Sequence, residues 1–271
     1  MPVSERQLAA FANTHAWRVP FDTSPRHLAG PGDGRHVTHG LAAAGWTRAS
    51  DPLSPEIVLT SPDHRHSLQF DPQSATAARW RLRAEPTDTE PGWYAEFGEL
   101  VPAEVLSAVT DALVVPSTVK TPDPLVTADA AGWLIDARSA ASSPDATCRV
   151  ERRSERNAAV SWHMEAHEPG HGPRGPRLWH AWFDARMPTR LVEAFVTALA
   201  DPAPLQRGMF DRTAHGAMQE PSPLPPQHVV DAHTERLRAL RARTRAARRR
   251  PQPETAKAPA PPPSPSASLR R

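Results

Sequence analysis

The chain has 271 residues, 39% of them hydrophobic, which is enough apolar surface for one sizeable core or two small ones. With one cysteine, Cys148, no intramolecular disulfide can form, and the first residues lack the basic and apolar regions of a secretory signal. No apolar run reaches the roughly 18 residues that a membrane-spanning helix needs, so we expect a cytoplasmic protein without a membrane span.

The formal net charge of +2 conceals a division of charge along the chain. From residue 219 onward there are 11 Lys and Arg against 4 Asp and Glu, whereas the preceding part has 21 against 26. An acidic body therefore carries a basic C-terminal part. Such asymmetry indicates an anionic partner for the basic part, which is either a nucleic acid, a membrane surface or the acidic body itself.

The N-terminal region reads as two helices separated by an extended segment. Residues 4–14 predict a short helix, because Ser4 and the glutamine three positions later form a capping-box pattern. Residues 20–29 are expected to be extended, and the glycine-rich stretch 30–34 breaks the chain. A second helix is expected over 35–44, where the following glycine provides a C-terminal stop.

Strands and a helix follow this region. The predicted strands cover residues 57–60, 67–70, 79–85 and 93–97. In the third strand Trp80, Leu82 and Ala84 alternate with charged residues, which is typical of a half-buried antiparallel strand. Pro102 then opens a helix whose apolar residues recur at helical spacing.

The chain then repeats itself. Residues 93–97 (Trp-Tyr-Ala-Glu-Phe) return as residues 179–183 (Trp-His-Ala-Trp-Phe), 86 positions later. Further elements recur at or near the same spacing, including Pro102 with Pro188, the Ser-Pro-Asp turns at 61–63 and 143–145, and Trp46 with Trp133. The predicted fold is α+β, with two tandem repeats of helix, antiparallel sheet and helix. We expect them to pack as one pseudo-symmetric body, each burying the apolar face of the other.

This reading divides the chain into six parts. The expected boundaries are a lead-in at 1–35, repeat 1 at 36–116, repeat 2 at 117–202, a linker at 203–226, a basic helix at 227–250 and a disordered tail at 251–271. The tail is rich in Pro, Ala and Ser, and such a composition buries too little apolar surface to offset the entropy lost on folding.

Several of these motifs resemble a known family. The segment 24–33 (Ser-Pro-Arg-His-Leu-Ala-Gly-Pro-Gly-Asp), Ala-Ala-Gly-Trp at 43–46, the Ser-Pro-Asp turn and Gly-Trp-Tyr-Ala-Glu-Phe-Gly at 92–98 look like an actinobacterial domain of unknown function, number three-seventeen, often found in tandem. The likeness covers about residues 24–202 and is looser in the second copy. It implies a streptomycete-type source, and it implies no activity, cofactor or catalytic residue.

Histidines supply the candidate metal ligands. His163, Glu165 and His167 share one face of a strand by alternation, with His180 on a neighbouring strand, and such groups can bind zinc or non-haem iron. The alternative is a polar solvent face, because the equivalent positions of repeat 1 carry Arg and Glu. We favour the second interpretation and expect no bound metal and no cofactor.

Three other features have similar alternatives. Asp33, His36 and His39 are spaced for ligation at a helix start, and the amides of the 30–34 loop are placed to bind an anion. The simpler readings are a polar helix start and a turn in which glycine adopts unusual backbone angles. Cys148 is expected to be a small core residue. No pattern specific for a catalytic centre is present, so no catalytic residue is predicted.

Two features are candidate partner contacts. Trp182 replaces Glu96 of the first repeat on the polar face of its strand, which indicates a contact surface. The predicted basic helix carries eight arginines, namely Arg236, Arg238, Arg241, Arg243, Arg245, Arg248, Arg249 and Arg250. Leu237 and Leu240 form a stripe that we expect to be too narrow for firm docking on the body.

The sequence favours a non-enzymatic binding or regulatory module with an unidentified protein partner. One alternative is a nucleic-acid-associated protein that acts through residues 236–250, although this helix can instead neutralise the acidic body. Another is an enzyme with an unrecognised site between the repeats. That alternative predicts a deep pocket in which His, Asp or Glu from both repeats converge.

Overall fold

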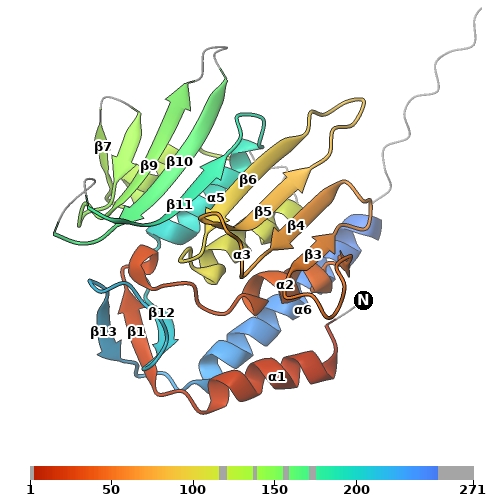
Figure 1. Cartoon of the computed structure of the whole chain (residues 1–271), viewed down its shortest axis with the longest axis horizontal. Coiled ribbons are helices and arrows are strands. Elements are labelled where there is room, and N and C mark those ends of the chain that lie inside the picture. The colour runs from red at the N-terminus through yellow and green to blue at the C-terminus, as the bar shows by residue number, and fades with distance from the viewer. Residues whose placement is uncertain (1–2, 116–120, 137–138, 155–158, 171–174, 250–271) are drawn as a thin grey trace, which may run out of the picture.

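The computed structural model describes residues 3–115, 121–136, 139–154, 159–170 and 175–249 (Figure 1). Arg250 and the tail expected to be disordered at 251–271 lie outside the described residues. Within the described helices none is both long and apolar enough to cross a bilayer.

A ten-stranded antiparallel sheet forms the centre of the molecule, in the order β2-β3-β4-β5-β6-β11-β10-β9-β8-β7 (Figure 1). The first repeat supplies β2 (Thr47–Arg48), β3 (Ile57–Thr60), β4 (His66–Phe70), β5 (Ala78–Ala84) and β6 (Trp93–Gly98). The second supplies β7 (Leu134–Asp136), β8 (Ala140–Ser142), β9 (Cys148–Ser154), β10 (Val160–His167) and β11 (Arg177–Phe183). The predicted α+β class with antiparallel tandem repeats is therefore confirmed.

The repeats join edge to edge through β6 and β11. Glu96 pairs with Trp182, and Phe97 and Ala95 pair with Ala181 and Phe183. Because Trp182 stands at the position equivalent to Glu96, this pair lies on the pseudo-two-fold axis. The expectation that each repeat buries the apolar face of the other is wrong, since backbone hydrogen bonds between these strands make one continuous sheet.

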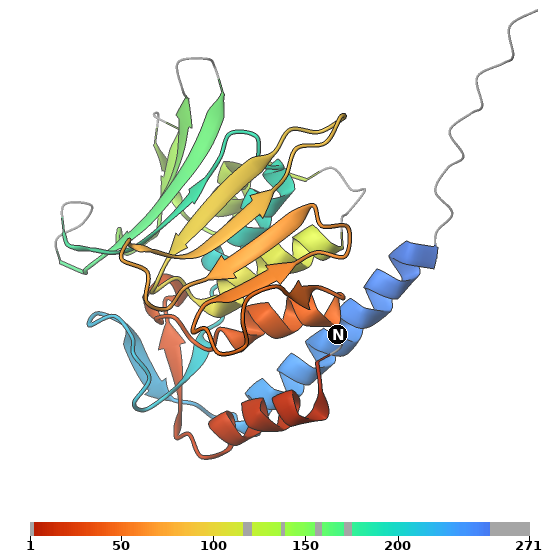
Figure 2. The same cartoon turned by 45° about the vertical axis from the view of Figure 1, so that its right-hand side comes forward.

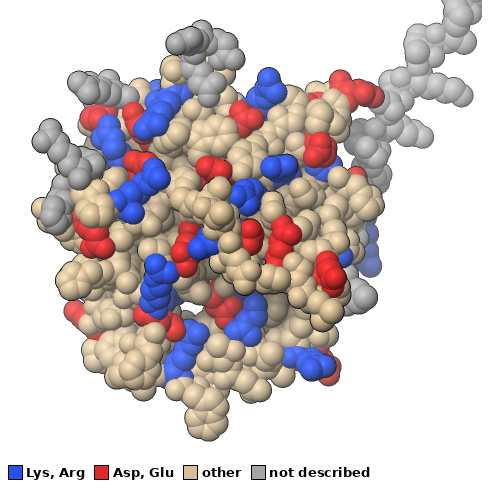
Figure 3. Space-filling view, in the orientation of Figure 1, with Lys and Arg blue, Asp and Glu red and all other residues tan. Residues whose placement is uncertain are grey.

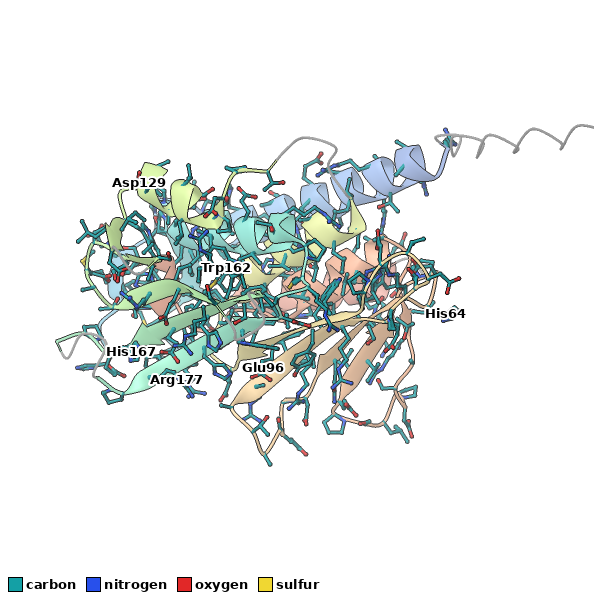
Figure 4. All side chains as sticks on the ribbon, turned by 90° about the horizontal axis from the view of Figure 1, so that it is seen from above. His64, Glu96, Asp129, Trp162, His167 and Arg177 are labelled. Atoms are coloured by element: carbon teal, nitrogen blue, oxygen red, sulfur yellow. The ribbon has the colours of Figure 1, made fainter. Side chains whose placement is uncertain are left out.

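Four helices cover one face of this sheet and explain why the repeats need no face-to-face contact. They are α2 (Arg35–Ala43), α3 (Ala103–Val114), α4 (Pro124–Ala130) and α5 (Thr189–Ala200). The helix-facing core contains Phe97, Phe183 and Phe195, whose ring centroids lie 5.3–5.8 Å apart. Figure 4 shows Trp162 on the helix side of the sheet and Glu96 on the opposite side.

The two Ser-Pro-Asp turns close equivalent hairpins, β3–β4 and β8–β9. In the first turn the Ser61 hydroxyl donates to Asp63 over 2.5 Å and accepts the amide of His66. In the second the Ser143 hydroxyl donates to Asp145 over the same distance and accepts the amide of Cys148. These side chains therefore satisfy the turn's own backbone, which explains why the motif recurs.

The chain termini build a second layer below the sheet. Helix α1 (Glu5–Ala16) begins with the predicted capping box. A three-stranded sheet in the order β12-β1-β13 joins β1 (Pro20–Ser24), β12 (Leu205–Gly208) and β13 (Met218–Pro221), and a short 3-10 turn, η1 (Arg26–Leu28), follows β1. The segment 203–226 is thus more than the linker that we expected, because two of its strands pair with residues almost 200 positions earlier.

Helix α6 (Gln227–Arg249) lies beside α1 and α2 (Figure 2). The expectation that its apolar stripe is too narrow to dock is wrong, because Leu237 and Leu240 are each only 2% exposed. Val230 and His233 extend the buried stripe toward the start of the helix. A histidine counted as polar in the sequence thus acts as a core residue and widens the docking face.

Candidate binding sites

The face of the large sheet opposite the helices is lined by polar and aromatic side chains. Figure 3 looks onto this face and shows blue and red side chains interspersed, with neither sign dominating. Ion pairs account for part of this mixture, with Arg177 2.9 Å from Glu165 and Arg153 2.8 Å from Glu151. The pattern is that of a solvated face and differs from the single-sign field of a nucleic-acid surface.

Trp182 lies near the centre of this face, on the seam between the repeats. Its ring centroid is 5.8 Å from that of Tyr94 and 6.3 Å from that of His163. The Tyr94 hydroxyl donates to Glu96 over 3.0 Å, and the Arg83 guanidinium lies 5.2 Å from the Tyr94 ring. Trp182 is therefore only partly exposed, held among neighbours that already cover much of its ring.

Two of the groups considered as metal ligands, Glu165 and His167, lie side by side, with 3.6 Å between Oε2 and Nε2. The other ring nitrogen of His167, Nδ1, lies 3.0 Å from the Gly175 carbonyl oxygen. His180 reaches Glu96, with 3.4 Å between Nε2 and Oε1. Over the described parts of the chain, no three His, Cys, Asp or Glu side chains converge as metal ligands would.

His36 and His39 belong to a buried aromatic cluster between α1, α2 and α6. His39 Nδ1 lies 3.2 Å from His233 Nε2, and the Phe11 ring stacks on His233 at 4.1 Å. Burial lowers the pKa of His39 to about 4 and that of His233 to about 3, so both rings are neutral at neutral pH. His15 completes the cluster from α1.

The glycine-rich loop before α2 faces acidic groups. Burial alone would raise the pKa of Asp33, but hydrogen bonds from His15 and Arg35 hold it well below the usual range. A Cβ on Gly32, whose φ is +62°, would lie 2.8 Å from a carboxylate oxygen of Glu104. Glu104 and the Arg207 guanidinium paired with it therefore already occupy the place in which an anion would have to bind.

Cys148 is 1% exposed and lies in the core of repeat 2. Burial raises its pKa well above the usual value, which keeps the sulfur a neutral thiol. This environment fits the expected inert core residue.

The arginines of α6 fall into two groups. Arg236 is anchored, because it donates to both carboxylate oxygens of Asp111 over 2.7 and 2.5 Å and to the His36 carbonyl over 2.8 Å. Arg241 lies partly buried against the N-terminal segment, 3.4 Å from the Val3 carbonyl. These two arginines are therefore engaged within the protein and are not free to contact a partner.

The remaining described arginines of α6 are exposed to solvent. They are Arg238, Arg243, Arg245 and Arg249. Of these four described arginines, Arg238 pairs with an acidic residue, Glu235, at 3.3 Å. The side chain of Arg248 and the whole of Arg250 lie outside the described residues. Figure 2 shows the last turns of α6 extending past the rest of the body.

Four exposed apolar residues, which the sequence analysis missed, lie where α1 leads into β1 and directly after β12. We call this group the aromatic end, and it comprises Trp17, 90% exposed, Phe210, 94%, Val19, 52%, and Met209, 47%. The Met209 amide donates to the Val19 carbonyl over 3.0 Å and joins the two segments. The pairing of β1 with β12 brings these residues together across some 190 positions, which no local pattern reveals.

A cavity of about 520 Å³ opens between α2, α3, α6 and β12 and is lined by several titratable groups. Among these, Glu104 is held by Arg207 over 2.7 and 3.0 Å. Burial would raise the pKa of Glu104, but Arg207 lowers it to about 2. His36 and His233 also line the cavity, and no residue of repeat 2 does. The enzyme alternative required titratable groups from both repeats, which this cavity does not bring together.

Comparisons with known proteins identify the repeated unit. Residues 60–119 and 142–205 each match the family model SPDY, a domain of unknown function (DUF317). The first match spans β4 to α3, and the second spans β9 to α5. Neither the curated proteins nor the solved structures contain a chain that matches this one.

Proposed function

We propose that this tandem pair of DUF317 domains is a non-enzymatic cytoplasmic binding module that docks a partner protein through its aromatic end. The observation that carries the proposal is the exposure of Trp17 and Phe210 on adjoining segments. Large aromatic side chains are costly to leave in water, and clustered exposed apolar residues mark interaction sites. Trp is also among the residues that most often anchor protein interfaces.

The area of the patch suits the anchor of a specific interface. An aromatic side chain buries roughly 150–250 Å² on association. With the half-exposed Val19 and Met209, the aromatic end offers roughly 400–500 Å² of apolar surface. A standard interface buries about 800 Å² on each partner. The aromatic end is therefore large enough to form the apolar centre, and polar surface around it would supply the rim.

The charges beside the patch favour a protein over a membrane surface. Arg18, which lies between Trp17 and Val19 in the sequence, is paired with Asp211 over 2.6 Å. Stable attachment to anionic lipid usually joins apolar side chains to free basic ones. A neutral apolar patch instead fits an apolar pocket on a partner protein. We propose Trp182 as a secondary contact only. Tyr94 and His163 partly cover its ring, which leaves less apolar surface for a partner.

The test compares wild-type protein with the double variant Trp17→Ser/Phe210→Ser. Partners captured from the native host would be purified and their affinities measured against each variant. Each anchor is worth about 2 kcal/mol, or ~30-fold in affinity, so loss of both should weaken binding by roughly 1,000-fold. Leu53→Ser is the matched control, because Leu53 is 93% exposed in the β2–β3 loop.

Two outcomes would contradict the proposal. One is a partner that binds the double variant as tightly as the wild type. The other is a wild-type protein that self-associates through the same residues and retains no other protein, since the occupant would then be a second copy of this chain. Equal melting temperatures for wild type and variant confirm that the fold is intact.

Nucleic-acid binding through α6 is a second candidate function. It is favoured by the exposed Arg243, Arg245 and Arg249, which lie on the helix end that extends past the body (Figure 2). Such spacing suits phosphate contacts better than base recognition. If these three arginines contact phosphates, log affinity should fall with log salt with a slope of about −3, and Arg243→Ala/Arg245→Ala should reduce it. Binding that does not depend on salt would exclude this function.

A further inference from the structure

A second cavity, of about 460 Å³, lies at the junction of repeat 2 with the terminal layer. The 3-10 turn after β1, the Ser-Pro-Asp turn at 143–145 and the end of α5 surround it. Cavities of about 300–1,000 Å³ with mainly apolar walls and a few polar groups are typical sites for small molecules. This one is independent of the aromatic end and of the exposed arginines of α6.

The walls of this cavity are mostly apolar. Trp133 and Leu199 line its interior, four prolines contribute further ring surface, and Met218, 64% exposed, lies at the mouth. Such walls suit an aromatic or branched hydrocarbon body. Only the few polar lining residues can hydrogen-bond to a ligand, so they determine which polar head group binds.

One of the two carboxylates in the lining is already fully engaged. Asp145 accepts from the hydroxyls of Ser143 and Thr147 over 2.5 and 2.8 Å, and from the Thr147 amide over 3.2 Å. His27 Nε2 lies 3.3 Å from its second oxygen. Asp145 therefore holds the turn and the neighbouring imidazole and has little capacity left for a ligand.

The guanidinium in the lining is also engaged. Arg26 donates to the carbonyls of Ala203 and Ala198 over 2.7 and 3.0 Å and pairs with Asp201 over 2.7 Å. An anionic ligand would have to displace one of these bonds. It would also have to approach the carboxylates of Asp145 and Asp201, which line the same cavity.

Asp201 is the lining carboxylate with unused capacity. Its oxygens accept the Ala203 amide over 2.9 Å and the Arg26 guanidinium, which leaves a lone pair on each, and its side chain is 42% exposed. We infer that this cavity binds a small primary amine with an aromatic or branched apolar body. The ammonium group donates to Asp201, and the body packs against Trp133 and the prolines.

Repeat 1 has an equivalent hollow that lacks the residue we assign to the ammonium group, and this difference supports the assignment. This hollow has a volume of about 370 Å³ and is lined by Trp46, the turn at 61–63 and the end of α3. In the sequence, Val115 is the residue equivalent to Asp201. Thr244 and Ala247 of α6 also line the hollow. The carboxylate of Asp201 thus has no counterpart at the matching place in repeat 1, where residues of α6 line the hollow.

The test uses three probes that share one body and differ in the head group. Phenethylamine, 2-phenylethanol and phenylacetate would be titrated into the full chain by calorimetry at neutral pH and physiological salt. We expect phenethylamine to bind one per chain, 2-phenylethanol more weakly and phenylacetate not at all. The methyl resonance of Met218, at the mouth of the cavity, should shift only with a probe that binds.

Two variants locate the site. Asp201→Asn should weaken phenethylamine binding at least ~10-fold, because it removes a charge-assisted hydrogen bond. Asp136→Asn is the matched control, since Asp136 is 38% exposed and pairs with Arg149 over 2.7 Å on another strand. The inference is overturned if phenylacetate binds as well as the amine, if Asp201→Asn has no effect, if both variants lose binding equally, or if phenethylamine does not bind.

Discussion

The buried histidines between α1, α2 and α6 make the stability of the protein depend on pH in a specific window. An unfolded histidine has a pKa of about 6.5, whereas burial lowers that of His39 to about 4 and that of His233 to about 3. The unfolded chain therefore binds more protons than the folded one below pH 6.5. The free energy of unfolding should accordingly fall as the pH falls through this range.

The magnitude follows from the two shifts. Each pKa unit corresponds to about 1.4 kcal/mol, so lowering the pH from 6.5 to 5 costs up to about 2 kcal/mol for each histidine. We expect a total loss of about 2–4 kcal/mol, which is a large part of a typical stability of about 5–15 kcal/mol. The carboxylates contribute little in this window, because unfolded Asp and Glu titrate near pH 4.

The groups facing the cluster do not reverse this sign. Phe11 stacks on His233 and offers it no charge. Arg35 and Arg236 act against protonation of His39 and His233 respectively, whereas Asp33 acts weakly in its favour. Glu104 favours the charged form of His36, but burial outweighs it and lowers that pKa too.

Urea melts at pH 7 and pH 5 measure the effect. His233→Leu should reduce the pH dependence, because it removes one of the buried histidines that take up a proton on unfolding. His228→Leu is the control, since His228 is exposed on the same helix. Equal stability at both pH values, or an unchanged pH dependence in His233→Leu, would refute the reasoning.

Three further predictions concern the core and the terminal helix. Trp93→Ala and Trp179→Ala should each lower the free energy of unfolding by about 3–5 kcal/mol, since both are buried, and a loss below ~1 kcal/mol in urea melts would show that the side chain is not core. Deleting 228–271 should lower the melting temperature, because the deletion removes the buried face of α6; an unchanged transition would mean that α6 does not dock. Arg236→Ala should lower the free energy of unfolding by about 1–3 kcal/mol, because it leaves Asp111 without its bidentate partner. An unchanged free energy of unfolding in chemical denaturation would contradict this prediction.

The strands and the duplication could be predicted because their signals are local. Alternation of Trp80, Leu82 and Ala84 with charged residues places β5 correctly, and all three apolar side chains are buried. The Ser-Pro-Asp turns depend on contacts within five residues, so the same letters give the same hairpin twice.

The errors arose where distant segments decide the structure. Strands β12 and β13 are only four residues long and are stabilised by pairing with β1, far away in sequence. The docking of α6 depends on His233, which is buried only because Phe11 and His39 cover it. The local sequence around a histidine does not indicate whether distant residues will bury it in the neutral form.

The aromatic end could not be found from the sequence for the same reason. Trp17 follows a helix whose apolar residues face inward, so it reads as one more core tryptophan. Its 90% exposure results from the place where α1 ends relative to the small sheet. Trp182 breaks the strand alternation and therefore looks like a contact residue in the sequence, although Tyr94 and His163 partly cover it.

Site-specific photo-cross-linking in the native host tests the central claim most directly. A photoreactive residue would be placed at Phe210 in one protein and at Leu53 in another, since both positions are more than nine-tenths exposed. The account predicts one protein partner cross-linked from position 210 and none of that partner from position 53. Cross-linking from position 53 alone, or equal labelling of the same protein from both positions, would contradict it.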